Sequence, residues 1–219
     1  MIDSIDSQRL YEYRFARIEQ DARVDVWREI AAYVYETLGK PERILDPAAG
    51  RCEFISAVPS RERWAVDEVA YAEAVADEGL TVVTSDIMTA DLPQDHFDAV
   101  WVSNFLEHLP DQMAIAAFLR RMRDVTRPGG KIAIMGPNFR YCGARYFDCA
   151  DHNVVLTEVA VAEHLHAAGF QVTRVTPRFL PYSFRGKLPP SARLTRAYLH
   201  LPLAWRLLGR QFLLVAEKP

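Results

Sequence analysis

The sequence predicts an α/β fold, a doubly wound and mostly parallel seven-stranded sheet with helices on both faces. From residue 43 onward, short apolar segments alternate with segments of helical periodicity, as in a chain of strand–helix units. Those short segments are hydrophobic on both sides, as strands are when helices cover both faces of a parallel sheet. With 219 residues, half of them hydrophobic and a quarter charged, the chain suffices for one domain with its own core.

An N-terminal helical cover is expected over residues 1–39. The first helix would place its apolar residues between Leu10 and Ile18. Asp21 is a suitable cap for the second helix, whose apolar residues recur at three- and four-residue steps until Gly39 ends it.

Six strands are expected within a core of residues 40–178, and a seventh closes the chain. A long helix with one apolar face separates the fourth strand from the fifth, and a helix from Thr157 to Gly169 precedes the sixth. The expected strands are residues 43–46, 64–67, 81–84, 97–103, 131–135, 170–175 and 211–217.

The stretch between the last two strands, residues 179–210, is expected to be a lid insertion. It holds two adjacent prolines and a helix-like stretch from Leu194 to Leu208. A connection of that length inside a compact domain is usually functional. Residues 1–219 therefore read as a single domain, in which 211–217 form the final strand.

Acidic and small residues follow the expected strands, at the edge where open parallel sheets bind ligands. The first strand ends in Asp46 and runs into a loop of small residues with one glycine, Gly50, which permits close approach of a ligand to the backbone. Asp67 ends the second strand 21 positions later, a spacing suited to ribose hydroxyls. A single glycine cannot provide a pyrophosphate cradle, so these residues indicate a nucleoside site without a phosphate site, a combination that suits S-adenosylmethionine.

With these residues at its strand ends, the chain resembles a class I, Rossmann-like S-adenosylmethionine-dependent methyltransferase. The resemblance covers most of residues 40–175 and the final strand, through five motifs in order: 46–52, Asp67, 86–87, 97–109 and 119–131. It implies an antiparallel last strand, S-adenosylmethionine as cofactor and S-adenosylhomocysteine as product. The cofactor-binding residues that it implies are Asp46, Ala48, Gly50, Asp67, Glu68, Asp86, Ile87, Asn104 and Phe105, with Arg14 from the N-terminal helices.

A narrower resemblance points to a bacterial subgroup found among polysaccharide and glycosyltransferase genes. It rests on residues 13–15, 137–142, 146–148 and 151–152. It implies transfer of a methyl group to a hydroxyl of a sugar, a glycan intermediate or a related natural product.

Two positions depart from the family pattern, since Ala48 and Cys52 replace its first and third glycines. Cys52 is open to two interpretations. A helix N-terminus lowers the pKa of a thiol, which would make Cys52 reactive, whereas a buried cysteine behaves as a small hydrophobic residue. The second interpretation is favoured.

Methyl transfer to a hydroxyl needs alignment and a general base. Histidine is the natural base near neutral pH, and the candidates are His152, ranked first, and His108. Tyr141, Tyr146 and Asp151 are expected to contact the substrate. No metal is expected, because Asn104 stands where a metal-binding variant of the Glu107–His108 motif would have a carboxylate.

Composition limits the class of partner. The formal net charge of −3 gives no bias toward nucleic acid, and no nucleic-acid partner is expected. The polar, acidic first residues and three cysteines without a Cys-x-x-Cys pair favour a cytoplasmic location. No acidic residue lies between Glu163 and Glu217, so the basic segment 178–210 suits an anionic or glycan-linked small-molecule acceptor, or peripheral contact with a membrane.

Two other functions remain open from the sequence. The fold could bind the cofactor for a reaction without methyl transfer, such as a cyclisation, or it could be a catalytically silent partner protein. The altered loop at Ala48 and Cys52 favours the silent protein, whereas the retained Asp46, Asp67 and Asp86 argue against it.

Overall fold

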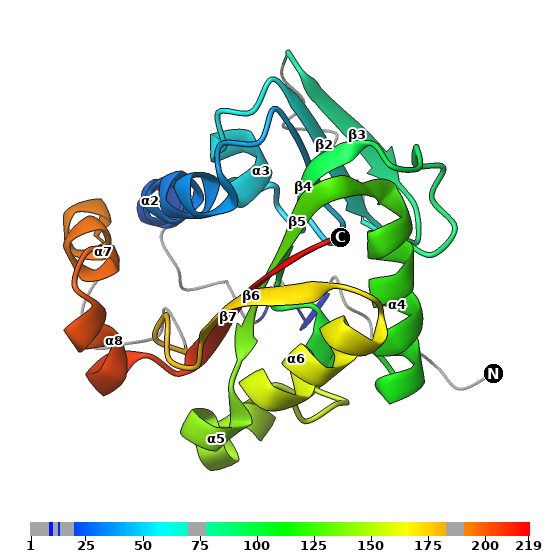
Figure 1. The fold of residues 1–219 in the computed structure, drawn as a ribbon. Helices are drawn as coiled ribbons and strands as arrows, with labels where there is room; N and C mark the ends of the chain where they lie inside the picture. Colours follow the sequence, from blue (N-terminus) through cyan, green and yellow to red (C-terminus); the bar gives the residue numbers. More distant parts are fainter. Residues whose placement is uncertain (1–8, 11–12, 14–19, 70–77, 183–190) are drawn as a thin grey trace.

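The fold is a central sheet between two layers of helices, seen in the computed structural model in Figure 1. The structure describes residues 9–10, 13, 20–69, 78–182 and 191–219. Most of the first expected helix, including Arg14, therefore lies outside the described residues. Among the described helices none is long and apolar enough to cross a membrane.

The sheet has seven strands in the order β3-β2-β1-β4-β5-β7-β6. Strand β7 runs antiparallel to both of its neighbours, and the other pairs are parallel. The predicted fold class is confirmed. The strands are β1 (Arg43–Asp46), β2 (Glu62–Asp67), β3 (Leu80–Thr84), β4 (Phe97–Ser103), β5 (Thr126–Pro137), β6 (Gln171–Thr176) and β7 (Gln211–Glu217).

Helices lie on both faces of the sheet (Figure 1). One layer holds α2 (Gln20–Leu38), α3 (Glu53–Ala57), α7 (Ala192–Leu199) and α8 (Pro202–Leu208), and the other holds α4 (Gln112–Val125) and α6 (Glu158–Ala167). Three short helical segments follow strand ends: η2 (Leu106–His108), α5 (Phe139–Cys142) and η3 (Gly143–Asp148).

Apolar periodicity explains how each layer packs. In α4 the Asp111 carboxylate accepts the Ala114 N–H at 2.8 Å and caps the helix. The helix then buries residues at steps of three and four, such as Ile115, Phe118 and Met122, against one face of the sheet. On the other face α2 buries Ile30 and Val34, and it ends where Gly39 adopts a positive φ of 86°.

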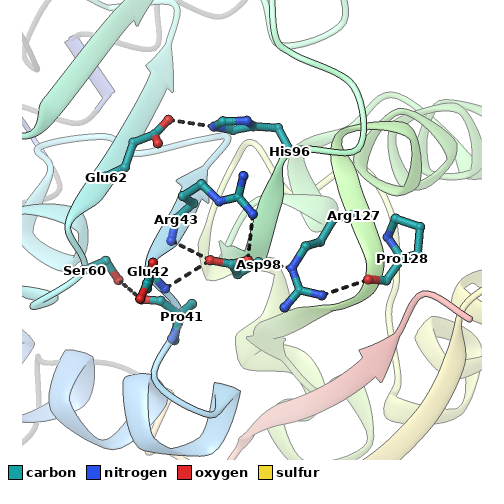
Figure 2. A network of polar contacts seen from close by, with 9 residues as sticks. All are labelled: Pro41, Glu42, Arg43, Ser60, Glu62, His96, Asp98, Arg127 and Pro128. Carbon is teal, nitrogen blue, oxygen red and sulfur yellow. Dashed lines mark hydrogen bonds and ion pairs between the residues drawn. The ribbon is translucent and has the colours of Figure 1, made fainter.

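A polar network fixes the amino ends of the parallel strands (Figure 2). Asp98 in β4 accepts the Arg43 backbone N–H of β1 at 2.8 Å and the Arg127 Nε–H of β5 at 2.6 Å. Beside it, the His96 Nε2 lies 2.7 Å from the Glu62 Oε1. The network ties four strands together at the edge opposite their carboxyl ends.

Several boundaries differ from the expected ones. Strand β5 begins at Thr126 rather than 131, because the turn before it also pairs: the Gly129 N–H donates to the Lys218 carbonyl and the Lys218 N–H donates to the Gly130 carbonyl. The expected cap Asp21 lies inside helix α2 rather than before it.

The described part of the expected lid, residues 179–182 and 191–210, forms a side layer against α2. Arg196 donates two hydrogen bonds of 2.7 Å to Glu29, and the Trp205 ring meets the Tyr33 ring edge-on at 5.9 Å. Residues 183–190, where the expected cover would continue, lie outside the described residues.

Candidate functional site

The predicted site residues gather at the carboxyl ends of the parallel strands. Strand order reverses between β1 and β4, since β2 and β3 lie on one side of β1 and β5 on the other. Such a switch point leaves room beside the strand ends, and open α/β sheets bind ligands there. The segments that leave β1, β2, β4 and β5 at this edge carry the residues described next.

The loop after β1 presents backbone to the site. Gly50 has a positive φ of 53°, and a Cβ built on it would meet no protein atom within 4 Å. Its N–H donates to Asp67 Oδ2 at 2.7 Å, which joins the ends of β1 and β2. Ala48 is half-buried, and its N–H points to Asp46 Oδ1 at 3.4 Å. The glycine therefore leaves space for close approach of a ligand.

Two carboxylates end the neighbouring strands. Asp46 is almost completely buried, and this burial raises its pKa to about 8. Asp67 is half-buried, and burial raises its pKa as well. Its two oxygens accept N–H groups from Gly50 and Val69. Because a carboxylate has about four lone-pair sites, Asp67 retains acceptor capacity that suits a ribose hydroxyl. The next residue, Glu68, is exposed.

The segments after β3 and β4 add apolar and polar residues to the candidate site. Asp86 is exposed and accepts the Met88 N–H at 2.8 Å, while Ile87 beside it is buried in the core. Asn104 takes a positive φ of 49° and donates its N–H to the Met135 carbonyl. Phe105 packs its ring 5.0 Å from that of Phe118. These are the contacts that an adenine ring needs: apolar surface with polar atoms at its rim.

Cys52 is a buried thiol at the start of α3. It adopts a positive φ of 61°, the conformation that glycine favours, and its side chain is fully buried. Burial raises the pKa of its thiol to about 12, and neighbouring carboxylates add to that effect. Both observations support the interpretation of Cys52 as a small hydrophobic residue over a reactive thiol.

The segment after β4 and the segment after β5 meet at His108. Its Nδ1 lies 3.0 Å from the Asp151 backbone oxygen and 3.2 Å from the Asp151 Oδ2. Because both are acceptors, Nδ1 carries a proton, and in the neutral ring the lone pair is on Nε2. Asp151, the neighbour of His152 in the sequence, thus contacts His108 in the fold.

His152 lies beside this pair. Its ring meets the His108 ring at 5.0 Å and the Tyr146 ring at 4.7 Å, both edge-on. Ligand-capable atoms of Glu107, His108 and His152 lie within 4.8 Å of one another, and those of Cys149, Asp151 and His152 do too. The set could therefore hold a metal ion, a possibility that the sequence motif alone argued against.

Sequence reasoning missed Glu107 as a site residue. Its side chain is buried, its Oε1 lies 4.0 Å from the His108 Nε2, and its backbone oxygen accepts N–H groups from Asn153 and Val154. An acidic residue beside the histidine was visible in the sequence. Its anchoring of the segment after β5 was not visible, because the contact joins residues far apart along the chain.

The two candidate substrate tyrosines differ in the structure. Tyr146 is fully buried, and its hydroxyl donates to the Val154 carbonyl at 2.6 Å and accepts the Leu156 N–H at 3.2 Å. That hydroxyl holds the loop together, so the expected substrate contact of Tyr146 is replaced by a structural role. Tyr141 is half-buried under the Arg178 guanidinium, 4.8 Å from its ring centre, and remains a candidate.

Two cavities lie away from this edge. One of about 520 Å³ adjoins the amino-end network, with Arg43, Arg61 and Lys131 in its lining. The other, about 500 Å³, lies between α2 and α7. Neither is lined by a predicted site residue.

The comparisons with known proteins agree with this geometry. Residues 45–134 match a family model described as a methyltransferase domain. That segment contains the end of β1, all of β2 to β4 and most of β5, with Asp46, Asp67 and His108. No curated protein matches the chain.

Solved structures share the fold at low sequence identity. A S-adenosylmethionine-dependent methyltransferase from Archaeoglobus fulgidus is 19% identical, with a TM-score of 0.67 over 97% of this chain and 100% of that one. The N-methyltransferase NodS from Bradyrhizobium japonicum, in complex with S-adenosylhomocysteine, is 13% identical, with a TM-score of 0.63 over 88% and 85%. The [4+2]-cyclase SpnF is 17% identical, with a TM-score of 0.62 over 88% and 80%. At these identities the three structures support the Rossmann-like α/β fold of this chain.

Proposed function

We propose that the protein is a S-adenosylmethionine-dependent methyltransferase that acts on a hydroxyl of a sugar, a glycan intermediate or a related natural product. The observation that carries the proposal is the bond from the Gly50 N–H to Asp67, because it joins a ligand-accessible loop to a carboxylate at the switch point of the sheet. Both residues lie in the segment that matches a methyltransferase domain.

The residues at the strand ends fit the cofactor. Asp67 would accept the ribose hydroxyls, Ile87 and Phe105 would flank the adenine, and Asp86 would meet its rim. The open space at Gly50 and Ala48 would take the methionine end. When bound, the cofactor supplies the methyl group as an electrophilic sulfonium.

His108 is the better placed of the two candidate bases. Asp151 holds its Nδ1–H, so the Nε2 lone pair is available to take the acceptor's hydroxyl proton. The Asp151 carboxylate also stabilises the imidazolium that forms. A positioned base of this kind contributes roughly 10²–10⁴-fold. His152, in edge contact with His108, would orient the base or the acceptor.

The residues around Tyr141 are our basis for the chemical class of the methyl acceptor. The Arg178 guanidinium stacks on its ring, and Arg210 Nη1 donates to its carbonyl at 2.6 Å. Two guanidinium groups beside a half-buried tyrosine suit an anionic acceptor, such as a phosphorylated or nucleotide-linked sugar.

Calorimetric titration tests the cofactor assignment. Purified protein is titrated with S-adenosylmethionine and with S-adenosylhomocysteine, alongside Asp67→Ala and the matched control Asp124→Ala, whose carboxylate is exposed on α4. Micromolar binding that survives in the control and is lost in Asp67→Ala supports the proposal. Absence of binding to both ligands in the folded wild-type protein would favour the silent partner protein instead.

Product mass separates methyl transfer from a reaction that leaves the cofactor unchanged, such as a cyclisation; the structurally similar SpnF is a [4+2]-cyclase. Sugar nucleotides and free glycans are screened as acceptors by mass spectrometry. A gain of one methyl group with release of S-adenosylhomocysteine supports the proposal. A product of unchanged mass with intact cofactor contradicts it.

A further inference from the structure

Five exposed leucines lie close together in the sequence on the helix pair α7 and α8. Their side chains are between half and four-fifths exposed, and they follow one another within fifteen residues. Exposed apolar groups gathered in this way mark an interaction site more often than a plain surface. We call this set the leucine face: Leu194, Leu201, Leu203, Leu207 and Leu208.

Helix α8 is held so that part of this face cannot turn inward. Trp205 is buried, its Nε1–H donates to the Tyr198 carbonyl at 2.8 Å, and its ring meets that of Phe179 edge-on at 5.2 Å. Leu203 and Leu207 are one helical turn apart and are 68% and 78% exposed. Since Trp205 fixes the inner side of α8, these two leucines project outward.

Positive charge accompanies the leucine face. Arg193 in α7 and Arg206 in α8 are both exposed. No acidic residue lies anywhere between Glu163 and Glu217 to oppose them. The surface therefore combines apolar side chains with cations, and the Glu29 carboxylate of the adjoining helix α2 is paired with Arg196.

We propose that the leucine face, with Arg193 and Arg206, docks the protein on the surface of an anionic lipid bilayer. Amphipathic helices with leucine on one face and basic residues beside it bind at the lipid interface, and anionic headgroups attract basic side chains. A protein partner is less favoured, because leucine is under-represented among the residues that dominate protein–protein binding. Helix α8, with seven residues, is far too short to span a bilayer.

The docking surface is rigidly joined to the loop after β5. Arg178 donates to the Leu207 carbonyl at 2.8 Å and stacks on Tyr141, and Arg210 donates to the Tyr141 carbonyl. Docking through α8 would therefore hold the acceptor side of the site near the lipid surface. This consequence rests on the proposed function, whereas the docking itself does not.

Vesicle flotation of the full chain tests the proposal. Wild-type protein is mixed with vesicles of phosphatidylcholine alone, or of phosphatidylcholine with about one third phosphatidylglycerol. The test variant is Leu203→Gln/Leu207→Gln. The matched control is Met113→Gln/Val159→Gln, which removes exposed apolar groups from α4 and α6 on the other face of the sheet.

We expect wild type and control to float with the anionic vesicles and not with the neutral ones, and the leucine variant to partition at least about tenfold more weakly. Arg193→Gln/Arg206→Gln should lower the partition and its dependence on salt. Equal flotation of the leucine variant and the control would overturn the proposal, and so would absence of flotation of the wild type. If the wild type does not bind vesicles but forms dimers that the leucine variant abolishes, the leucine face binds a second copy of the chain. That result would also overturn the proposal. Far-UV circular dichroism and thermal melting verify that each variant is folded.

Discussion

The His108 Nδ1 and the Asp151 Oδ2 lie 3.2 Å apart, although 43 positions separate the two residues in the chain. The contact exists because the Glu107 backbone oxygen accepts the N–H groups of Asn153 and Val154, which brings the segment after β5 back to the end of β4. A carboxylate that orients a histidine supports the use of that histidine as a base. On this ground we propose His108 ahead of His152, which stood first in the ranking from the sequence.

The first prediction concerns this pair. His108→Gln should lower kcat by roughly 10²–10⁴-fold and leave the Kd for S-adenosylmethionine unchanged, because it removes proton transfer and no cofactor contact. Asp151→Asn should lower kcat by about tenfold or more and shift the acidic limb of the pH–rate profile. His166→Gln, at an exposed position in α6, is the control. Loss of turnover in His152→Gln with full turnover in His108→Gln would assign the base to His152 instead.

Metal removal gives the second prediction. Glu107, His108 and His152 are close enough to share an ion, but the proposed reaction uses the His108 Nε2 lone pair for a proton. An ion on that atom would block it. Dialysis against a chelator should therefore leave kcat unchanged. Loss of turnover that added Zn²⁺ or Mg²⁺ restores would make the cluster a metal centre and remove His108 as the base.

Thiol labelling gives the third prediction. Burial raises the pKa of Cys52 to about 12 and that of Cys142 to about 11, so neither forms thiolate near neutral pH. Cys149 is partly exposed. Native protein treated with iodoacetamide should carry the label on Cys149, and urea-unfolded protein should carry it on all three cysteines. Peptide mass mapping checks this, and native labelling of Cys52 would revive its interpretation as a reactive thiol.

The sheet was predictable because its central strands, such as β1, β4 and β7, are short and mostly apolar segments. Strands 43–46, 97–103 and 211–217 were placed at their observed bounds. Strand β5 is longer than expected because its first residues pair with β4 and β7, and a pattern within one segment does not contain that information. Tertiary pairing set this boundary.

The site was predictable to the extent that strand ends determine it. Asp46, Asp67 and Gly50 follow directly from the ends of β1 and β2. The partner of His108 was not predictable, because the path from β5 to α6 is fixed by contacts between distant residues. The buried Tyr146 hydroxyl holds that path through Val154 and Leu156. The sequence of a polar loop does not indicate such contacts between distant residues.

The fourth prediction uses the buried carboxyl of Asp46. Burial raises its pKa to about 8, well above the value near 4 of an unfolded aspartate. A raised folded-state pKa gives stability that is fully present below about pH 4 and lost as the pH rises toward 8. In the Asp46→Asn variant the side-chain amide at this position does not titrate. Without cofactor, the variant's free energy of unfolding relative to wild type should therefore increase by on the order of 5 kcal/mol between about pH 4 and pH 8.

Urea unfolding at several pH values measures this difference, with Asp91→Asn, an exposed position, as the control. A difference between Asp46→Asn and wild type that stays constant over the range would mean that the Asp46 carboxyl is ionised in the folded protein.

The last prediction concerns Asp98, at the opposite edge of the sheet (Figure 2). Partial burial opposes its ionisation, but hydrogen bonds from Arg127 and Arg43 prevail and lower its pKa to about 2. A lowered folded-state pKa gives stability that is fully present above the unfolded value near 4 and lost as the pH falls toward 2. Because the side chain keeps some contact with solvent, we expect about 1–2 kcal/mol from this group at neutral pH.

Asp98→Asn should therefore lower the free energy of unfolding by at least that amount at neutral pH, since it also leaves two guanidinium groups beside a neutral amide. The gap between variant and wild type should close as the pH falls from about 5 toward 2. Asp25→Asn, which breaks an exposed pair with Arg28, should change stability by under about 0.5 kcal/mol and serves as the control. Chemical unfolding across this pH range decides the matter. A gap that does not depend on pH would mean that Asp98 contributes by shape and neutral hydrogen bonding alone, because only its charge can titrate in that interval.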